Sequence, residues 1–407
     1  MIRFVFALLI ALSANVFADK AWQFETGGMV TARAVVFQGR IYVTGGTKLY
    51  ALNLEGEQHW DYDAGAASFS GVAISGKTVF MLADNGLHAL DLDGKLQWRF
   101  ETQDSALKVE GKTMGWGEGM FVDPWAFYRS VPVFAGGKIL FSNARGTFAL
   151  NAASGEQLWY TNTGITHTQP AIHGDIVVVG SWDNYLYGLN LEDGSEVWKV
   201  ASRLPGGAMA GWLGWEGFNL DPVIHKGIVY AGNRGTHFYA IDAKTGIEQW
   251  SSKHPSSWIG SPAIVSDEVV YFGLSDGYSL KGLQTRMGNQ VLLFRNNFYN
   301  FAQPQVNGSH VFMASLSGEL FAIEKATGQA RELFATEASR KNLAELLAPT
   351  GGMKPYYTAR DGYSHETASR DVHRMLTKLN SLLSLTLADG VLYAGSANGT
   401  LYAIPVR

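Results

Sequence analysis

Short stretches of alternating apolar and polar residues fill the chain, and glycine-containing turns separate them. The segment "AIHGDIVVVGSWDNYLYGLN" at 171–190 shows the pattern clearly, with two apolar runs before the phrase "LYGLN". A period of two residues, interrupted by tight turns, predicts antiparallel β-strands. We therefore expect an all-β fold built from consecutive hairpins.

One short phrase recurs eight times within this pattern. The copies are LYALN at 49, LHALD at 87, TFALN at 147, LYGLN at 186, FYAID at 238, LKGLQ at 280, LFAIE at 320 and LYAIP at 401. Four of the seven intervals between copies are 38 to 42 residues long, which is typical of a four-stranded propeller blade. The sequence therefore predicts one domain over 19–407, an eight-bladed β-propeller.

A tryptophan follows five of the copies, four positions after a turn glycine, as in "DGSEVW". Because its place is so regular, a packing anchor between neighbouring blades is favoured over a ladder of ligand-binding rings. The sixth and seventh copies have Leu292 and Glu332 in this position, so their blades depart from the pattern.

The two ends of the chain complement each other. The last copy ends at LYAIPVR without a tryptophan strand, whereas Trp22 precedes Trp60 by 38 residues. We expect residues 20–27 to supply the fourth strand of the last blade, which closes the propeller and removes exposed sheet edges.

Three intervals between copies are longer, at 60, 52 and 81 residues. Their extra residues, about 102–128, 202–219 and 336–380, fall between the last strand of one blade and the first strand of the next. These connections share one face of a propeller, so the insertions are expected to cap one mouth of the central channel. In the third insertion, Val372, Met375, Leu376, Leu379 and Leu383 recur at helical spacing, which predicts a small helical hairpin.

Two of the insertions carry similar residues. Trp116, Glu118 and Asp123 in "GWGEGMFVDPW" correspond to Trp215, Glu216 and Asp221 in "GWEGFNLDP". Tryptophans beside carboxylates suit a polar or cationic ligand. They equally suit a cap that packs onto the blades, with Asp-Pro starting a turn.

Further candidates for ligand or partner binding lie around the same mouth. They come from the first insertion, from positions just before strand-starting prolines, and from loops between the second and third strands: Trp125, Gln169, Gln303, Arg145, Trp182 and Arg234. The two arginines could contact an anion. His365 and His373 are weak candidates for a metal site, since surface histidines are common on amphipathic helices. No catalytic motif is present.

Composition narrows the functional classes. The formal net charge is −4, so nucleic acid is not an expected partner. The absence of cysteine excludes disulfides, thiolate metal sites and a lipid anchor on an N-terminal cysteine. The motif "GVAISGKT" at 71–78 matches a P-loop, but an apolar strand follows it in place of the required helix.

The N-terminus MIRFVFALLIALSANVFADK has an arginine, an apolar run and then small residues. This order predicts a signal peptide over 1–18, cleaved near Ala18. No later segment reaches the roughly 20 apolar residues of a membrane span. We expect a soluble, monomeric protein that is periplasmic or secreted.

The segment "QPAIHGDIVVVGSWDNYLYGLNLEDGSEVW" resembles the PQQ-type, or quinoprotein-like, β-propeller repeat. By length and compactness, the chain is most similar to the BamB branch of that family, a non-catalytic subunit of the outer-membrane β-barrel assembly machinery. This resemblance implies a protein-interaction scaffold for envelope proteins. Quinoprotein alcohol dehydrogenases share the repeat but carry a vicinal cysteine pair, so PQQ is not expected, nor is any other cofactor. The alternative is an enzyme or sensor that binds a small polar ligand in the capped funnel.

Overall fold

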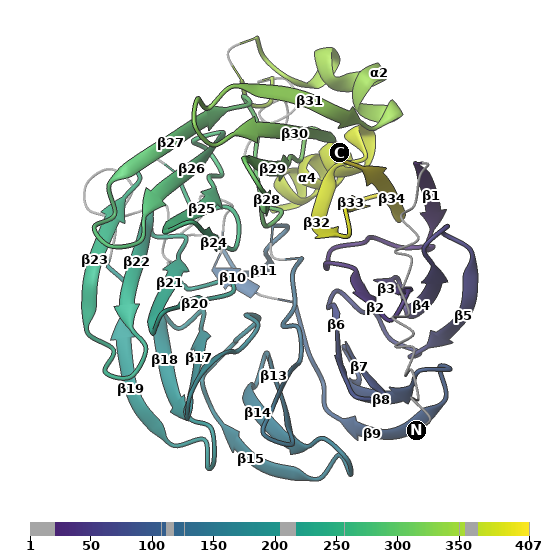
Figure 1. Cartoon of the computed structure of the whole chain (residues 1–407), viewed down its shortest axis with the longest axis vertical. Coiled ribbons are helices and arrows are strands. Elements are labelled where there is room, and N and C mark those ends of the chain that lie inside the picture. The colour runs from purple at the N-terminus through teal and green to yellow at the C-terminus, as the bar shows by residue number, and fades with distance from the viewer. Residues whose placement is uncertain are drawn as a thin grey trace, which may run out of the picture.

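The computed structural model describes residues 21–106, 108–110, 118–125, 127–203, 217–255, 257–349, 351–354 and 365–406. Its strands form eight four-stranded antiparallel sheets, arranged as blades around a central axis (Figure 1), and one separate two-stranded hairpin. The eight-bladed propeller predicted from the repeats is confirmed. The predicted signal peptide lies outside the described residues.

Each blade runs from an inner first strand to an outer fourth strand. Blade 1 contains β2 (Val35–Phe37), β3 (Arg40–Gly45), β4 (Lys48–Asn53) and β5 (Gln58–Asp63). Blade 2 contains β6 (Val72–Ser75), β7 (Thr78–Ala83), β8 (Gly86–Asp91) and β9 (Leu96–Glu101). Blade 3 contains β12 (Val133–Ala135), β13 (Lys138–Asn143), β14 (Gly146–Asn151) and β15 (Gln157–Thr161). Blade 4 contains β16 (Ala171–His173), β17 (Ile176–Gly180), β18 (Tyr185–Asn190) and β19 (Glu196–Ala201).

The second half of the propeller repeats this order. Blade 5 contains β20 (Val223–His225), β21 (Ile228–Gly232), β22 (His237–Asp242) and β23 (Glu248–Lys253). Blade 6 contains β24 (Ile264–Ser266), β25 (Val269–Gly273), β26 (Ser279–Gln284) and β27 (Gln290–Arg295). Blade 7 contains β28 (Gln305–Asn307), β29 (His310–Ala314), β30 (Glu319–Glu324) and β31 (Ala330–Ala335). Blade 8 contains β32 (Leu382–Ala388), β33 (Val391–Ser396), β34 (Thr400–Pro405) and β1 (Trp22–Glu25).

Blade 8 joins the two ends of the described chain, as predicted. Strand β1 pairs antiparallel with β34, and Trp22 lies opposite Ala403. The P-loop-like motif spans the β6–β7 hairpin, where Gly76 takes the turn with φ +59°. No helix follows it, which agrees with the strand reading of that motif.

The repeated tryptophans join neighbouring blades. In blade 1, the Trp60 indole nitrogen donates to the Leu92 carbonyl of blade 2 at 2.9 Å. The ring also covers Gly94, where a Cβ would approach within 2.7 Å. Trp22, Trp159, Trp198 and Trp250 donate in the same way to the next blade. The packing-anchor interpretation is therefore confirmed for these tryptophans. In blade 6, Leu292 is buried in the same position.

A second contact between blades lies two residues after the tryptophan. There a side chain of the outer strand packs against a side chain of the third strand of the next blade. We call these two side chains an interblade pair. Five of these pairs are aromatic, with ring centroids 4.9 to 5.9 Å apart: Phe24–Tyr50, Tyr62–His88, Phe100–Phe148, Phe294–Phe321 and Phe334–Tyr402. Such pairs add about 0.5–1.5 kcal/mol each beyond the burial of apolar area.

The insertions supply the remaining elements. The hairpin of β10 (Lys108–Glu110) and β11 (Met120–Val122), which the sequence did not predict, connects blades 2 and 3. Helices α2 (Glu337–Leu346) and α4 (His365–Leu379) lie beside blades 7 and 8 (Figure 1). Leu383 was expected on the second helix but lies in β32. Asn380 ends the helix with φ +46°, so the apolar periodicity continues into a strand.

Acid is expected to destabilise the protein through His88, one member of an interblade pair. This buried ring interacts with the Tyr62 hydroxyl and the Asn85 side-chain oxygen, each at 2.9 Å. Burial lowers the pKa of His88 to about 4, whereas the unfolded chain protonates near 6.5. The unfolded state therefore binds more protons below pH 6.5. About 3 kcal/mol of stability should be lost as the pH falls from 6.5 to 4.

Replacing His88 with phenylalanine, the residue at the equivalent position of blade 3, tests this expectation. Urea unfolding between pH 4 and 7 should show a shallower pH dependence for His88→Phe than for the unchanged protein. His59→Gln changes an exposed histidine and should leave the pH dependence as it was. Equal slopes for all three proteins would contradict the assignment.

Candidate functional site

Asp123 and Arg234 form a buried ion pair at the capped mouth of the propeller. Asp123 follows β11 in the first insertion, and Arg234 lies in the loop between β21 and β22 of blade 5. The Arg234 Nη1 and Asp123 Oδ2 atoms are 2.6 Å apart, and both side chains are almost fully buried. Two residues that the sequence placed in separate candidate sets therefore meet.

Two tryptophans enclose the guanidinium of Arg234. Its carbon lies 4.7 Å from the ring centroid of Trp182 and 4.5 Å from that of Trp258. Stacking between two rings in a buried place adds cation–π attraction to the ion pair. Burial lowers the pKa of Arg234, and the charge of Asp123 opposes this change. We call Asp123, Trp182, Arg234 and Trp258 the arginine clamp.

A second charged cluster lies deeper in the channel. The Arg33 Nη2 atom donates to the Gln169 side chain at 3.2 Å, and Nη1 donates to Gln303. The backbone N–H of Gln169 donates to Asp221 Oδ1 at 2.7 Å. Burial raises the pKa of Asp221, while this hydrogen bond and the charge of Arg33 act in the opposite direction. Three of the predicted rim residues therefore meet at one place.

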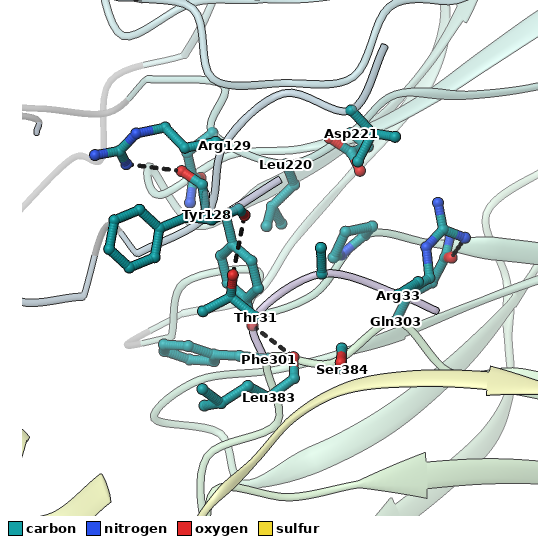
Figure 2. A pocket seen from close by; sticks show the side chains of 15 residues that line it. Thr31, Arg33, Tyr128, Arg129, Leu220, Asp221, Phe301, Gln303, Leu383 and Ser384 are labelled. Carbon is teal, nitrogen blue, oxygen red and sulfur yellow. Dashed lines mark hydrogen bonds between the residues drawn. The ribbon is translucent and has the colours of Figure 1, made fainter. Parts of the chain in front are cut away.

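This cluster borders a small pocket of about 50 Å³ below the cap. Figure 2 shows Arg33, Gln303 and Asp221 on one side of it and Tyr128 and Phe301 on the other. The Tyr128 hydroxyl donates to the Leu383 carbonyl at 3.2 Å. The side chain thus spans from the first insertion to blade 8.

Trp125 packs the cap onto the propeller. Its ring centroid lies 5.4 Å from that of Tyr299 and 5.6 Å from that of Phe301. These rings belong to an apolar cluster that also contains Met375 and Leu379 of α4. At Trp125, the packing interpretation of the cap aromatics holds.

The remaining predicted residues are either exposed or have side chains outside the described part of the chain. Glu118 and Arg145 are exposed, and so is His373. Trp116, Trp215 and Glu216 lie outside the described residues, as does the side chain of His365. No group of three or more potential metal ligands occurs in the described part of the chain.

Sequence reasoning missed several charged or aromatic residues near the mouth. Trp258 could have been noticed, because it lies outside the repeated tryptophan position. Arg129 and His167 had no such signal; their Nε and Nε2 atoms each lie 3.2 Å from Asp104. Burial acts to raise the pKa of Asp104, but these two partners outweigh it and the pKa is lowered.

Comparison with known proteins decides the family. A family model described as "Outer membrane protein assembly factor BamB" matches residues 15–115, 122–200 and 208–407. The chain belongs to the BamB family. The resemblance found in its repeats is therefore confirmed.

Relatives of the BamB family match parts of the chain. BamB of Alkalilimnicola ehrlichii is 27% identical over 154 residues, which are 38% of this chain and 39% of that protein. BamB of Nitrosomonas eutropha is 31% identical over 116 residues, or 28% and 27% of the two chains. The chain thus matches less than two fifths of the length of these relatives.

The fold of a BamB protein matches over nearly the whole chain. The crystal structure of BamB from Moraxella catarrhalis superposes with a TM-score of 0.67 and covers 95% of this chain and 98% of that one. Sequence identity in this superposition is 16%, so the likeness concerns the fold. Among the described residues, no helix has both the length and the apolar character needed to cross a membrane.

Proposed function

We propose that this protein is a non-catalytic, periplasmic interaction propeller that holds envelope proteins on its capped face. Membership of the BamB family supports a role of the outer-membrane assembly type. The predicted signal peptide supports export. Loops carried by a rigid scaffold are also where binding residues concentrate in proteins generally.

The observation that carries the proposal is the apolar surface of the cap hairpin. On β11, Met120 is 61% exposed and Val122 is 42% exposed. Residues two apart on a strand share one face, so the two side chains present a common apolar edge. Glu118, which is also exposed, precedes them. An apolar edge bordered by a charge suits a protein partner.

The ligand-binding alternative has less support at the capped mouth. Asp123 and Arg234 neutralise each other, and Trp182 and Trp258 stack on the guanidinium. A small polar ligand would have to compete with these internal partners. The absence of PQQ and of other cofactors remains a prediction.

Affinity capture from envelope extracts tests the proposal. The mature chain and a Met120→Asp/Val122→Asp variant serve as baits, and captured proteins are identified by mass spectrometry. We expect the variant to capture outer-membrane assembly proteins in amounts at least tenfold lower than the unchanged chain does. The reason is that both introduced carboxylates would be buried in the interface.

A matched control separates the cap from general surface effects. Leu96→Asp changes a side chain on β9 that is 42% exposed, like Val122, and should capture partners normally. Equal capture by all three baits would exclude the hairpin as the contact. Capture of no envelope protein by any bait would overturn the scaffold function itself.

A further inference from the structure

At the junction between blades 5 and 6, the interblade pair contains no aromatic side chain. At the interblade pair defined above, it has Ser252 on β23 and Lys281 on β26. At the two remaining junctions, Tyr187 and Tyr239 are the aromatic members of their pairs. All eight pairs lie in the described part of the chain, and this is the one in which neither side chain is aromatic.

A cavity of about 360 Å³ lies at this junction. Lys281, Arg295 and His254 line it, together with Leu293 and Tyr278. Lys281 is the member of the interblade pair that lines the cavity, and the other seven blades have an aromatic ring in its position. The cationic lining of the cavity therefore follows from a local departure from the repeat.

Register places the two cations on one face of the blade. Ser279 pairs with Arg295 across β26 and β27, and Lys281 pairs with Leu293. Because side chains alternate between faces, residues 279, 281, 293 and 295 share a face. Lys281 and Arg295 thus converge on the cavity from adjacent strands.

His254 adds a third hydrogen-bond donor. Its ring is 2% exposed, and its Nδ1 lies 3.0 Å from the Lys281 ammonium. The ammonium can only donate, so Nδ1 accepts and Nε2 carries the proton. Within the described residues this Nε2 has no hydrogen-bond partner. A buried donor without a partner costs free energy that a bound acceptor would recover.

Positive charge exceeds negative charge around the cavity. No carboxylate of the described residues forms an ion pair with Lys281 or Arg295. Asp276 also lines the cavity, and its charge acts on Arg234 of the arginine clamp. Burial lowers the pKa of Lys281, and the nearby charge of Arg295 lowers it further. An anion between these two groups would offset both effects.

We propose that this cavity binds the carboxylate or phosphate group of a small organic anion, held by Lys281, Arg295 and His254. Arg295 and Lys281 supply charge-assisted hydrogen bonds. Leu293 and Tyr278 provide apolar contact for the organic part. The site lies between two blades, and no residue of the cap hairpin lines it.

Calorimetric titration of the mature chain with inorganic phosphate and with citrate, at low ionic strength, tests the site. We expect saturable binding of one anion per chain for at least one of the two probes. Lys281→Met and Arg295→Gln should each weaken binding at least tenfold. Binding of phosphate alone or of citrate alone would support the site and identify the preferred group.

Two further variants keep the test decisive. Arg286→Gln removes an exposed cation in the same blade and should bind normally. The double variant Ser252→Phe/Lys281→Tyr restores the aromatic pair of the repeat. It should abolish binding while the thermal unfolding midpoint is unchanged or higher. The proposal is overturned if neither anion binds saturably, or if binding survives Lys281→Met and Arg295→Gln unchanged.

Discussion

Replacing Arg234 with leucine should lower the free energy of unfolding by about 3–5 kcal/mol, because the change leaves Asp123 buried without its partner. The ion-pair distance of 2.6 Å and the near-complete burial of both side chains place this pair at the costly end of such changes. Loss of the stacking on Trp182 and Trp258 adds to the effect. Urea unfolding followed by tryptophan fluorescence gives the difference.

Arg145 provides a matched control for this experiment. It occupies the corresponding loop of blade 3 but is exposed, so Arg145→Leu should change the free energy of unfolding by less than about 0.5 kcal/mol. The double variant Asp123→Leu/Arg234→Leu removes both charges and should be more stable than Arg234→Leu alone. Similar stabilities for Arg234→Leu and Arg145→Leu would show that the arginine clamp does not hold the cap to blade 5.

Weakening the contact between blade 8, where the two chain ends pair, and blade 1 should lower the free energy of unfolding by a similar amount. The double variant Trp22→Ala/Phe24→Ala is expected to lose about 4 kcal/mol or more, since each large-to-small change removes apolar burial and leaves a cavity. Trp22 donates to the Leu54 carbonyl at 2.9 Å, and the Phe24 ring lies 5.3 Å from that of Tyr50. These contacts hold blade 8 against blade 1.

Hydrogen exchange can locate the effect. Amide protons of β34 that pair with β1 should exchange much faster in the double variant, while the strands of blade 4 change little. Gln23→Ala changes an exposed side chain of the same strand and should leave both regions as they were. A uniform increase in exchange over all blades would show that closure is not a separable step.

Local sequence patterns were sufficient to predict much of the propeller. The turn glycines, the alternation of apolar residues and the repeated tryptophans act between neighbours in sequence or between adjacent repeats. For that reason the sequence alone assigns Trp22 to the last blade. The helical periodicity that runs through Leu383 was misleading, because the apolar positions of a strand happened to continue those of α4.

Local sequence patterns predict only part of the candidate site. The sequence indicates Asp123, Trp182 and Arg234 as binding candidates, but not as one group, and it does not indicate Trp258. Nothing in their spacing indicates that an aspartate of the first insertion neutralises an arginine of blade 5. The Arg33 contacts with Gln169 and Gln303 likewise join blades 1, 4 and 7 across the channel.

Sequence by itself determined the number of blades, their order and the closure through β1, because these depend on a periodic pattern that each repeat expresses locally. Tertiary structure alone decided which side chains meet at the mouth and which junction is left unfilled. Those outcomes depend on contacts between distant segments. The cations also differ in their partners: Asp123 neutralises Arg234 within the fold, whereas Lys281 and Arg295 face a cavity.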